Sequence, residues 1–355
     1  MMRAVLYASA IALICSLIGT PIAVKAFIRL GYGQEIREDG VQKHLAKRGT
    51  PTMGGTVIVL ATLLGYFLTK VLTWEAPTAS ALLVLFLMAG MGSVGFVDDF
   101  IKIHRRRSLG LRAKAKLVGQ WIVTIVFAVL ALRFRDSLGL TPASDHISFL
   151  HDIGWLSLGP VVFVVWSYLL TAGWSNAVNI TDGQDGLCTG ASVMAFAAYV
   201  VIGVWQYGQS CAVSTAGGCY VVRDPLDLAV VAASIMGACF GFLWWNAAPA
   251  KIIMGDTGSL GLGGAFAGLS ICTRTEVLAV IVGGLFVIEL LSVVIQVGSF
   301  KLRHGKRVFK IAPVHHHFEM LDWPEVNVTI RFWIIAGLCV VFGLGVFYGG
   351  FAAHW

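Results

Sequence analysis

The feature that most constrains this chain is a run of apolar residues that recurs along its whole length. A helix needs ~20 apolar residues to cross a membrane, and ten segments approach or reach that length. These segments are residues 4–24, 56–71, 80–97, 117–132, 161–178, 190–207, 228–245, 260–271, 277–300 and 329–351, the eighth being unusually short. Because lipid offers the backbone no hydrogen bonds, each must be helical. The sequence predicts an all-α integral membrane protein with about ten transmembrane helices.

The composition supports a single membrane domain over residues 1–355. With 57% hydrophobic and 13% charged residues, the chain has too little polar surface to cover soluble domains. Its net charge of +7 comes from basic loops beside the apolar segments. That placement favours membrane topology and anionic lipid over nucleic acid as the reason for the charge.

The basic residues also predict the orientation. If the N-terminus lies outside, 20 of the 26 lysines and arginines fall in inward-facing loops. Cytoplasmic loops carry this excess in membrane proteins, so we expect both termini outside. The inward loops are then about 30–51, 98–116, 179–189, 246–259 and 301–328. The first apolar segment is interpreted as an anchor, because its basic residues follow it instead of preceding it.

Two of the seven cysteines differ from the rest. Cys211 and Cys219 lie in the polar stretch GQSCAVSTAGGCYVVRDP, which this topology places outside, where oxidation is allowed. We predict that they form a disulfide bond.

Carboxylates gather at the inward ends of several segments. Asp98 and Asp99 end the third segment, and adjacent like charges disfavour joint ionisation unless a cation compensates them. A solvated helix end is the simple alternative, whereas a divalent cation such as Mg²⁺ would use one or two such carboxylates with substrate phosphates. Asp256 begins the eighth segment inside the glycine-rich MGDTGSLGLGG, where a helix N-terminus favours phosphate.

A second polar group follows the fifth segment. Asn179, Asp182 and Asp185 recur at a spacing of three within SNAVNITDGQDGLCTG, and a single aspartate N-cap would explain only one of them. Lysines 102, 114 and 116 follow the aspartate pair, and for any one of them membrane topology alone is a sufficient explanation. Together these residues predict a cytoplasmic site that handles phosphate with the help of a metal ion.

Three consecutive histidines, His315, His316 and His317, stand in IAPVHHHFEMLDWPE. Neighbouring side chains point in different directions, so the three cannot all reach one Zn²⁺. Hydrogen bonds to phosphate or sugar oxygens suit them better. Glu289, within the ninth segment, is interpreted as a buried interhelical hydrogen-bonding residue, with a weaker alternative along a lipid path.

Several segments together resemble the phospho-N-acetylmuramoyl-pentapeptide transferase family. These are KRGTPTMGG, GFVDDF, LGLRAKAK, NAVNITDGQDGL, PAKIIMGDTGSL and PVHHHFE, in order along essentially the whole chain. The resemblance implies transfer of phospho-N-acetylmuramoyl-pentapeptide from its UDP carrier to undecaprenyl phosphate. The products are UMP and lipid I, the first lipid-linked intermediate of peptidoglycan. It also implies a Mg²⁺ cofactor and a multi-pass protein of the bacterial plasma membrane, and it leaves a homodimer open.

The resemblance also implies roles for individual residues. Asp98, Asp99, Lys116 and Asp256 match catalytic positions, with Asp256 and Asp99 as metal ligands. The positions that match substrate-binding residues are Lys47, Thr52, Lys102, Asn179, Asp182, Asp185, Gly186, Leu187, Asn246 and His315 to His317. Gly186 and Leu187 match the backbone around uracil. Two residues depart from the family pattern. An aromatic residue is usual where this chain has Ile253, so weaker stacking on uracil is expected, and an apolar residue is common where it has Gln184.

Two other functions compete with this one. A polyprenyl-phosphate N-acetylglucosamine-1-phosphate transferase would share the aspartate pair, but PVHHHFE disfavours it. A transporter would fit ten helices and the intramembrane Glu289, yet transporters bind near the membrane midplane between repeats. Here the acids lie at the inner ends of the segments.

Overall fold

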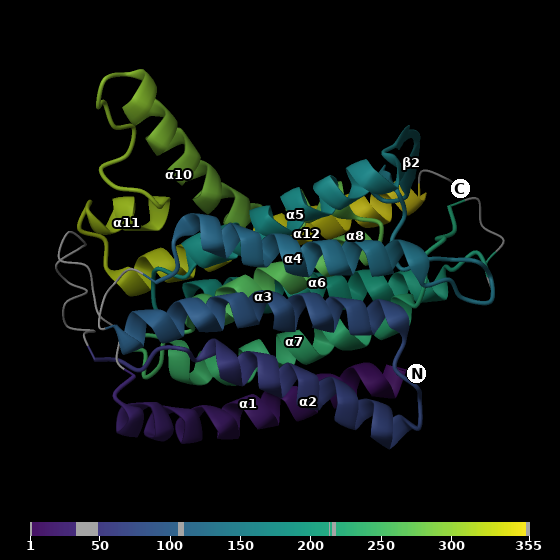
Figure 1. The fold of residues 1–355 in the computed structure, drawn as a ribbon, viewed down its shortest axis with the longest axis horizontal. Coiled ribbons are helices and arrows are strands. Elements are labelled where there is room, and N and C mark those ends of the chain that lie inside the picture. Colours follow the sequence, from purple (N-terminus) through teal and green to yellow (C-terminus); the bar gives the residue numbers. More distant parts are fainter. Residues whose placement is uncertain (1, 33–48, 106–109, 213, 215–217, 353–355) are drawn as a thin grey trace.

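The computed structural model describes residues 2–32, 49–105, 110–212, 214 and 218–352. Long helices pack side by side along a common direction, and Figure 1 shows the N- and C-termini at the same end of this bundle. Nine helices of the described residues are long and apolar enough to cross a membrane. The predicted all-α membrane fold is therefore confirmed, whereas its orientation in the membrane stays a prediction.

The nine helices account for nine of the ten expected segments. They are α1 (Met2–Leu30), α2 (Gly55–Thr73), α3 (Ala79–His104), α4 (Ala113–Arg133), α5 (Gly159–Thr181), α6 (Leu187–Gly208), α7 (Pro225–Asn246), α10 (Gly284–Leu302) and α12 (Glu325–Ala352). The remaining elements are β1 (His146–Ser148), β2 (Asp152–Ser157), α8 (Gly255–Cys272), α9 (Glu276–Val282) and α11 (Val314–Glu319). The two strands form an antiparallel hairpin that pairs His146 with Ser157.

The eighth expected segment is the helix α8, which is not among the nine. It carries Asp256 and six glycines, and its residues from Thr257 to Cys272 are all buried. α8 packs against α2, α3 and α5, so neighbouring helices cover it. A helix that meets protein on its sides needs small residues for close approach more than it needs apolar bulk.

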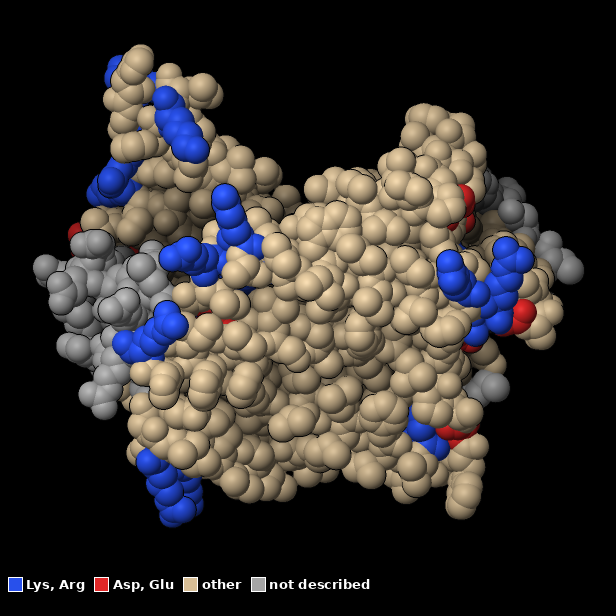
Figure 2. Space-filling model, viewed as in Figure 1, with Lys and Arg blue, Asp and Glu red and all other residues tan. Residues whose placement is uncertain are grey.

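The ninth expected segment is broken at Gly283 into α9 and α10. A side chain at Gly283 would collide with the rings of Trp174 and Phe266, at 2.7 and 3.0 Å from an added Cβ. Gly283 and Gly284 together supply the kind of glycine pair at which helices kink. Figure 1 shows α10 leaving the bundle as an arm, and Figure 2 shows the surface hollowed between this arm and the end that carries β2.

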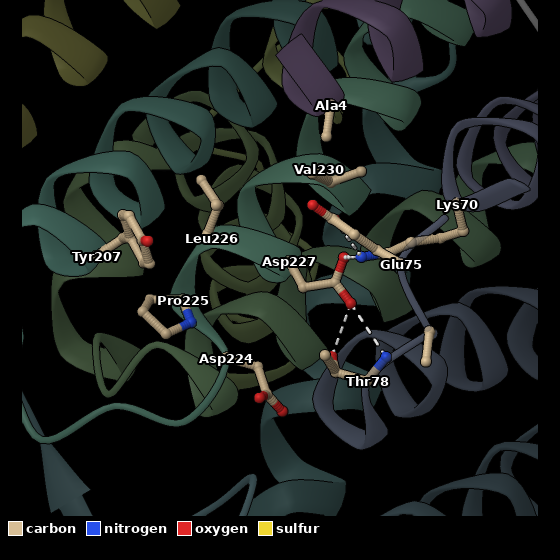
Figure 3. A pocket seen from close by; sticks show the side chains of 11 residues that line it. Ala4, Lys70, Glu75, Thr78, Tyr207, Asp224, Pro225, Leu226, Asp227 and Val230 are labelled. Carbon is tan, nitrogen blue, oxygen red and sulfur yellow. Dashed lines mark hydrogen bonds and ion pairs between the residues drawn. The ribbon is translucent and has the colours of Figure 1, made fainter. Parts of the chain in front are cut away.

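On the face of the bundle that Figure 2 shows, charged side chains gather toward the two ends. In Figure 2 a broad uncharged band separates the charged ends, and the arm tip is basic. At the end that holds both termini, Asp227 closes a small cavity of about 260 Å³ between α1, α2 and α7 (Figure 3). The Asp227 carboxylate lies 2.7 Å from the Lys70 ammonium and accepts hydrogen bonds from Tyr66 and Thr78. These interactions fasten α7 to α2 and α3.

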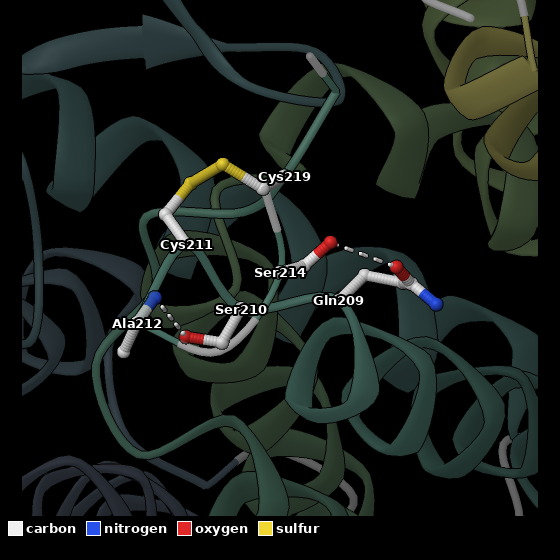
Figure 4. The surroundings of a disulfide bond; sticks show 6 residues. All are labelled: Gln209, Ser210, Cys211, Ala212, Ser214 and Cys219. Atoms are coloured by element: carbon white, nitrogen blue, oxygen red, sulfur yellow. Dashed lines mark hydrogen bonds between the residues drawn. A yellow bond between two sulfur atoms is a disulfide. The ribbon is translucent and has the colours of Figure 1, made fainter. Parts of the chain in front are cut away.

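The predicted disulfide bond is confirmed. Cys211 and Cys219 are joined in the loop between α6 and α7, near the termini (Figure 4). Tyr220 donates its backbone N–H to the Gln209 carbonyl, and the Cys211 N–H returns a bond to Tyr220. The crosslink therefore closes a short loop whose base is already hydrogen-bonded.

Replacing both Cys211 and Cys219 by serine is expected to lower the free energy of unfolding by about 2–3 kcal/mol, the chain entropy of closing so short a loop. Denaturant unfolding in detergent, with and without reductant, measures it. Reductant should destabilise the parent protein and leave the double variant unchanged. Equal stability of parent and variant under oxidising conditions would show that the bond does not constrain the unfolded chain.

Candidate active site

Three carboxylates from two helices meet at the end of the bundle opposite the termini. Asp98 and Asp99 lie in the last two turns of α3, and Asp256 lies in the first turn of α8. One oxygen from each of the three lies within 4.8 Å of the others. Asp98 and Asp99 are buried, with 3% of the surface of each residue exposed. The sequence placed these residues at the same membrane face, and the fold brings them into contact distance.

Two lysines neutralise part of this charge. The Lys102 ammonium lies 2.6 Å from Asp98 Oδ2 and 3.1 Å from Asp256 Oδ2. The Lys116 ammonium, at the start of α4, lies 2.6 Å from the same Asp256 oxygen. Three carboxylates therefore face two ammonium groups, which leaves negative charge for a further cation.

Asp99 fixes the start of α8. Its Oδ2 accepts hydrogen bonds from the backbone N–H and the hydroxyl of Thr257, both at 2.9 Å, and its Oδ1 accepts one from the Asp256 N–H at 3.2 Å. Unpaired N–H groups at a helix start favour a carboxylate in this position. Asp99 thus holds Asp256 in place through the backbone, in addition to being one of the three clustered acids.

Asn179 and Asp182 approach the same turn from the end of α5. Asn179 donates hydrogen bonds to Asp256 Oδ1 and to the Ser259 hydroxyl, both at 2.8 Å. Asp182 accepts one from the Gly255 N–H at 3.2 Å. Desolvation of this carboxyl group, and after it the nearby Asp256 charge, raise the pKa of Asp182 to about 7. Burial and the neighbouring Asp256 therefore both disfavour the ionised form of Asp182.

The predicted uracil-side residues lie next to this cluster, on the turn between α5 and α6. Gly186 has a positive φ of 74°, and an added Cβ there would lie 3.3 Å from the Ala247 Cα, so this backbone requires glycine. Asp185 accepts a hydrogen bond from the Ala250 N–H, and Leu187 is fully buried. Asn246 is buried too, where it accepts from Thr189 and donates to the Ile252 carbonyl. Asn246 thereby holds the loop that follows α7.

The last residues of the loop before α2 contact the segment that leads into α8. Thr52 is buried, and its hydroxyl would lie 3.1 Å from a Cβ added at Gly255. Ile253 donates its N–H to the Pro51 carbonyl and accepts at its own carbonyl from Gly54, while its side chain is partly exposed. Lys47 lies outside the described residues. The backbone of the loop before α2 is therefore paired to the approach of α8.

The three histidines diverge as expected of neighbours on a short helix. His315 is fully buried with Nδ1 3.0 Å from Glu289 Oε2 of α10. His316 Nδ1 lies 2.6 Å from Glu319, and His317 Nδ1 accepts a hydrogen bond from the Lys310 N–H. A Cβ at Gly183 would overlap Nε2 of His315 and lie 3.1 Å from Nε2 of His316. Two of the rings therefore face the turn that carries Asp182 and Asp185.

Sequence reasoning missed the residues that support this geometry. Thr257 and Ser259 bond to Asp99 and Asn179, and Glu325 accepts the Asp185 N–H at 3.0 Å. The hydroxyls of the GDTGS stretch were a visible signal, because serine and threonine in the first turn of a helix commonly serve hydrogen bonds. Nothing in the sequence indicates that Glu325 pairs with Asp185, because 140 residues separate the two.

Comparison with known proteins agrees with the motifs. Residues 81–274 match glycosyl transferase family 4, and residues 47–59 match signature 1 of phospho-N-acetylmuramoyl-pentapeptide-transferase. A phospho-N-acetylmuramoyl-pentapeptide-transferase of Streptomyces avermitilis is 61% identical over 99% of both chains. The proteins of the same name from Streptomyces griseus and a Nocardioides species are 61% and 59% identical, each over 99% of this chain and 99% and 100% of their own. The chain belongs to the phospho-N-acetylmuramoyl-pentapeptide-transferase family.

Proposed function

We propose that this chain transfers phospho-N-acetylmuramoyl-pentapeptide from UDP-N-acetylmuramoyl-pentapeptide to undecaprenyl phosphate, giving lipid I and UMP. The observation that carries the proposal is the cluster of Asp98, Asp99 and Asp256 around two lysine ammonium groups at one end of a membrane bundle. Such a site suits a reaction between a phosphate in the membrane and a diphosphate from the cytoplasm. Family membership supplies the identity of the sugar.

The donor set fits Mg²⁺. All three candidate ligands are carboxylates, and Mg²⁺ prefers oxygen ligands from one or two carboxylates together with substrate phosphates. Asp256 is the most exposed of the three, at 15% of its side chain, whereas both oxygens of Asp99 are already bonded to α8. We assign Asp256 as the principal ligand with Asp99 beside it. When bound there, Mg²⁺ would neutralise charge on the diphosphate.

The chemistry is proposed to be a single displacement. An oxygen of the lipid phosphate forms a bond to the phosphorus next to the sugar, while the bond from that phosphorus to the UMP oxygen breaks. Lys102 and Lys116 place two positive charges beside the reacting phosphates. Asp98 accepts hydrogen bonds from Lys102 and the Leu111 N–H, which orients it to take the residual proton of the lipid phosphate. With a second pKa near ~6, that phosphate hardly needs a base at neutral pH.

A covalent phospho-aspartate intermediate is the rival to the single displacement. The configuration at phosphorus separates the two, because one displacement inverts it and two restore it. Net retention with a chiral thiophosphate donor would contradict the single step.

The arm α10 is the proposed path for the polyprenyl chain. Its exposed large side chains include Ile288, Leu291, Val294, Ile295, Val297 and Phe300, all apolar. Figure 2 shows the surface hollowed next to the arm. α10 packs on α5, whose inner end carries Asn179. An isoprenoid chain along this side would bring its phosphate toward the acidic cluster.

We further propose that both termini lie outside and that the site faces the cytoplasm. The 20 basic residues predicted to face inward support this, and the disulfide bond lies at the end with the termini. Disulfide bonds persist in oxidising compartments, which agrees with an outer location of that end.

The test is release of UMP by the detergent-purified protein with undecaprenyl phosphate and Mg²⁺. UDP-N-acetylmuramoyl-pentapeptide and UDP-N-acetylglucosamine are offered in parallel. We expect release from the muramoyl donor alone. Release only from the acetylglucosamine donor would replace the proposed substrate, and no release from either in folded protein would refute transferase activity.

A further inference from the structure

The buried pair Glu289–His315 is not explained by the acidic cluster. Both side chains have 0% exposure, and Nδ1 of His315 lies 3.0 Å from Oε2 of Glu289. Burying a carboxylate in an apolar helix costs several kcal/mol unless it is paired. A mere link between helices could use neutral groups, so an acid in this position calls for a specific partner. The imidazole of His315 is that partner.

The other ring nitrogen of His315 faces the turn between α5 and α6. Nε2 is fully buried and has no hydrogen-bond partner among the described residues. Nδ1 meets Glu289 through the 3.0 Å contact alone, without hydrogen-bond geometry. A Cβ added at Gly183 would overlap Nε2, which places this nitrogen directly against the turn that holds Asp182 and Asp185. A buried nitrogen without a partner, beside the turn predicted to bind substrate, is a group held ready for a hydrogen-bond donor of a ligand.

The position of the carboxylate decides what Nε2 can do. A carboxylate at Nδ1 keeps a proton on that nitrogen and fixes the orientation of the ring. With the proton on Nδ1, Nε2 of the neutral ring is a hydrogen-bond acceptor. Without Glu289 the ring can rotate or change tautomer, and the nitrogen facing Gly183 is no longer defined. His316 has its own carboxylate, because its Nδ1 lies 2.6 Å from Glu319 of the same helix.

A second contact between the same two helices offers a matched control. Ser292 lies one turn after Glu289 on α10, and its hydroxyl accepts a hydrogen bond from the Val314 N–H at 3.0 Å. Ser292 and Glu289 thus both attach the first turn of α11 to α10. Only Glu289 touches the imidazole ring.

We propose that Glu289 is a positioning residue of the transfer reaction, acting through His315 to present Nε2 as an acceptor to a hydroxyl or N–H group of the nucleotide-sugar donor. The proposal rests on the proposed function, since it names the donor as the ligand. It predicts that the contribution of Glu289 is to donor binding and not to the stability of the bundle.

Glu289→Gln is expected to raise KM for UDP-N-acetylmuramoyl-pentapeptide about 10- to 100-fold, as when the carboxylate behind a ligand-binding histidine is removed. KM for undecaprenyl phosphate should stay within about 2-fold. Tm should not fall, because the glutamine amide keeps a polar group of the same shape beside Nδ1 while a buried charge is removed. Ser292→Ala should leave donor KM within about 3-fold. An unchanged donor KM in folded Glu289→Gln would overturn the proposal, as would an equal rise in Ser292→Ala.

A double-mutant cycle tests whether Glu289 acts through the ring. In a His315→Gln background, Glu289→Gln should change donor KM less than about 2-fold, because the group it positions is gone. A rise in donor KM as large as in the parent background would overturn the proposal. If Glu289→Gln does not fold, Glu289→Asp withdraws the carboxylate by one methylene and keeps the charge; donor KM must then rise more than about 3-fold. An inactive parent protein would refute the proposed function instead.

Discussion

Asp256→Asn is expected to reduce kcat for UMP release by about 10³-fold or more. The substitution keeps the shape of the side chain but removes the charge on which Lys102, Lys116 and Asn179 converge. It also removes the principal candidate metal ligand. A loss of ~4 kcal/mol in transition-state stabilisation corresponds to this factor. The measurement is UMP release under saturating donor and lipid, alongside the increase in Tm that Mg²⁺ gives the parent protein.

Asp322→Asn is the matched control for that experiment. Asp322 is exposed and has a positive φ of 63°, a conformation that asparagine adopts readily. Its activity and its response to Mg²⁺ should equal those of the parent. If Asp256→Asn retained more than a tenth of the parent kcat, or kept the full Mg²⁺ effect on Tm, the assignment of Asp256 would be wrong.

Gly95→Ala is expected to reduce kcat by about 100-fold although Gly95 carries no functional group. A Cβ there would overlap the carbonyl of Asp256 and lie 2.7 Å from the Thr257 backbone nitrogen. Backbone atoms cannot turn aside as a side chain can, so the start of α8 must move away from α3. That movement lengthens the bonds from Asp99 to α8, and a misplacement of ~1 Å at reacting groups can cost this factor.

Gly173→Ala, in α5, separates the local clash from a general effect of glycine replacement. An added Cβ at Gly173 has nothing within 4 Å, so this variant should keep parental kcat and be as stable or slightly more stable. Both variants are compared by kcat and by Tm. Parental kcat in Gly95→Ala would show that α8 can shift without disturbing Asp256.

Much of the site could be predicted from the sequence, because it lies in short segments at the ends of apolar runs. Asp98 and Asp256 were expected at one membrane face, because each lies at the end of a span that was predicted to face inward. Their direct neighbourhood could not be predicted, because it depends on glycines such as Gly95 that let α3 and α8 approach. Apolar periodicity says where a helix runs but not which helix it touches.

The ninth predicted span shows a second feature that hydropathy alone does not reveal. A continuous apolar run predicted one helix over 277–300, yet the chain kinks at Gly283 where Trp174 and Phe266 leave no room for a side chain. The kink releases α10 from the bundle and leaves Glu289 facing His315. The pairing of these two residues depends on tertiary packing, and the hydropathy of a single segment cannot predict it.

The composition of α8 has a consequence for how the protein is made. A segment that begins with a carboxylate and is rich in glycine gains little by entering lipid alone, because it offers few large apolar side chains and its carboxylate would be unsatisfied there. Its entry into the bilayer then depends on α2, α3 and α5, which are synthesised earlier and line the slot it occupies. Asp256 reaches its neighbours only at that late step. A partly assembled bundle therefore holds no complete set of acids, and the nascent chain cannot act on its donor before most of it has been inserted.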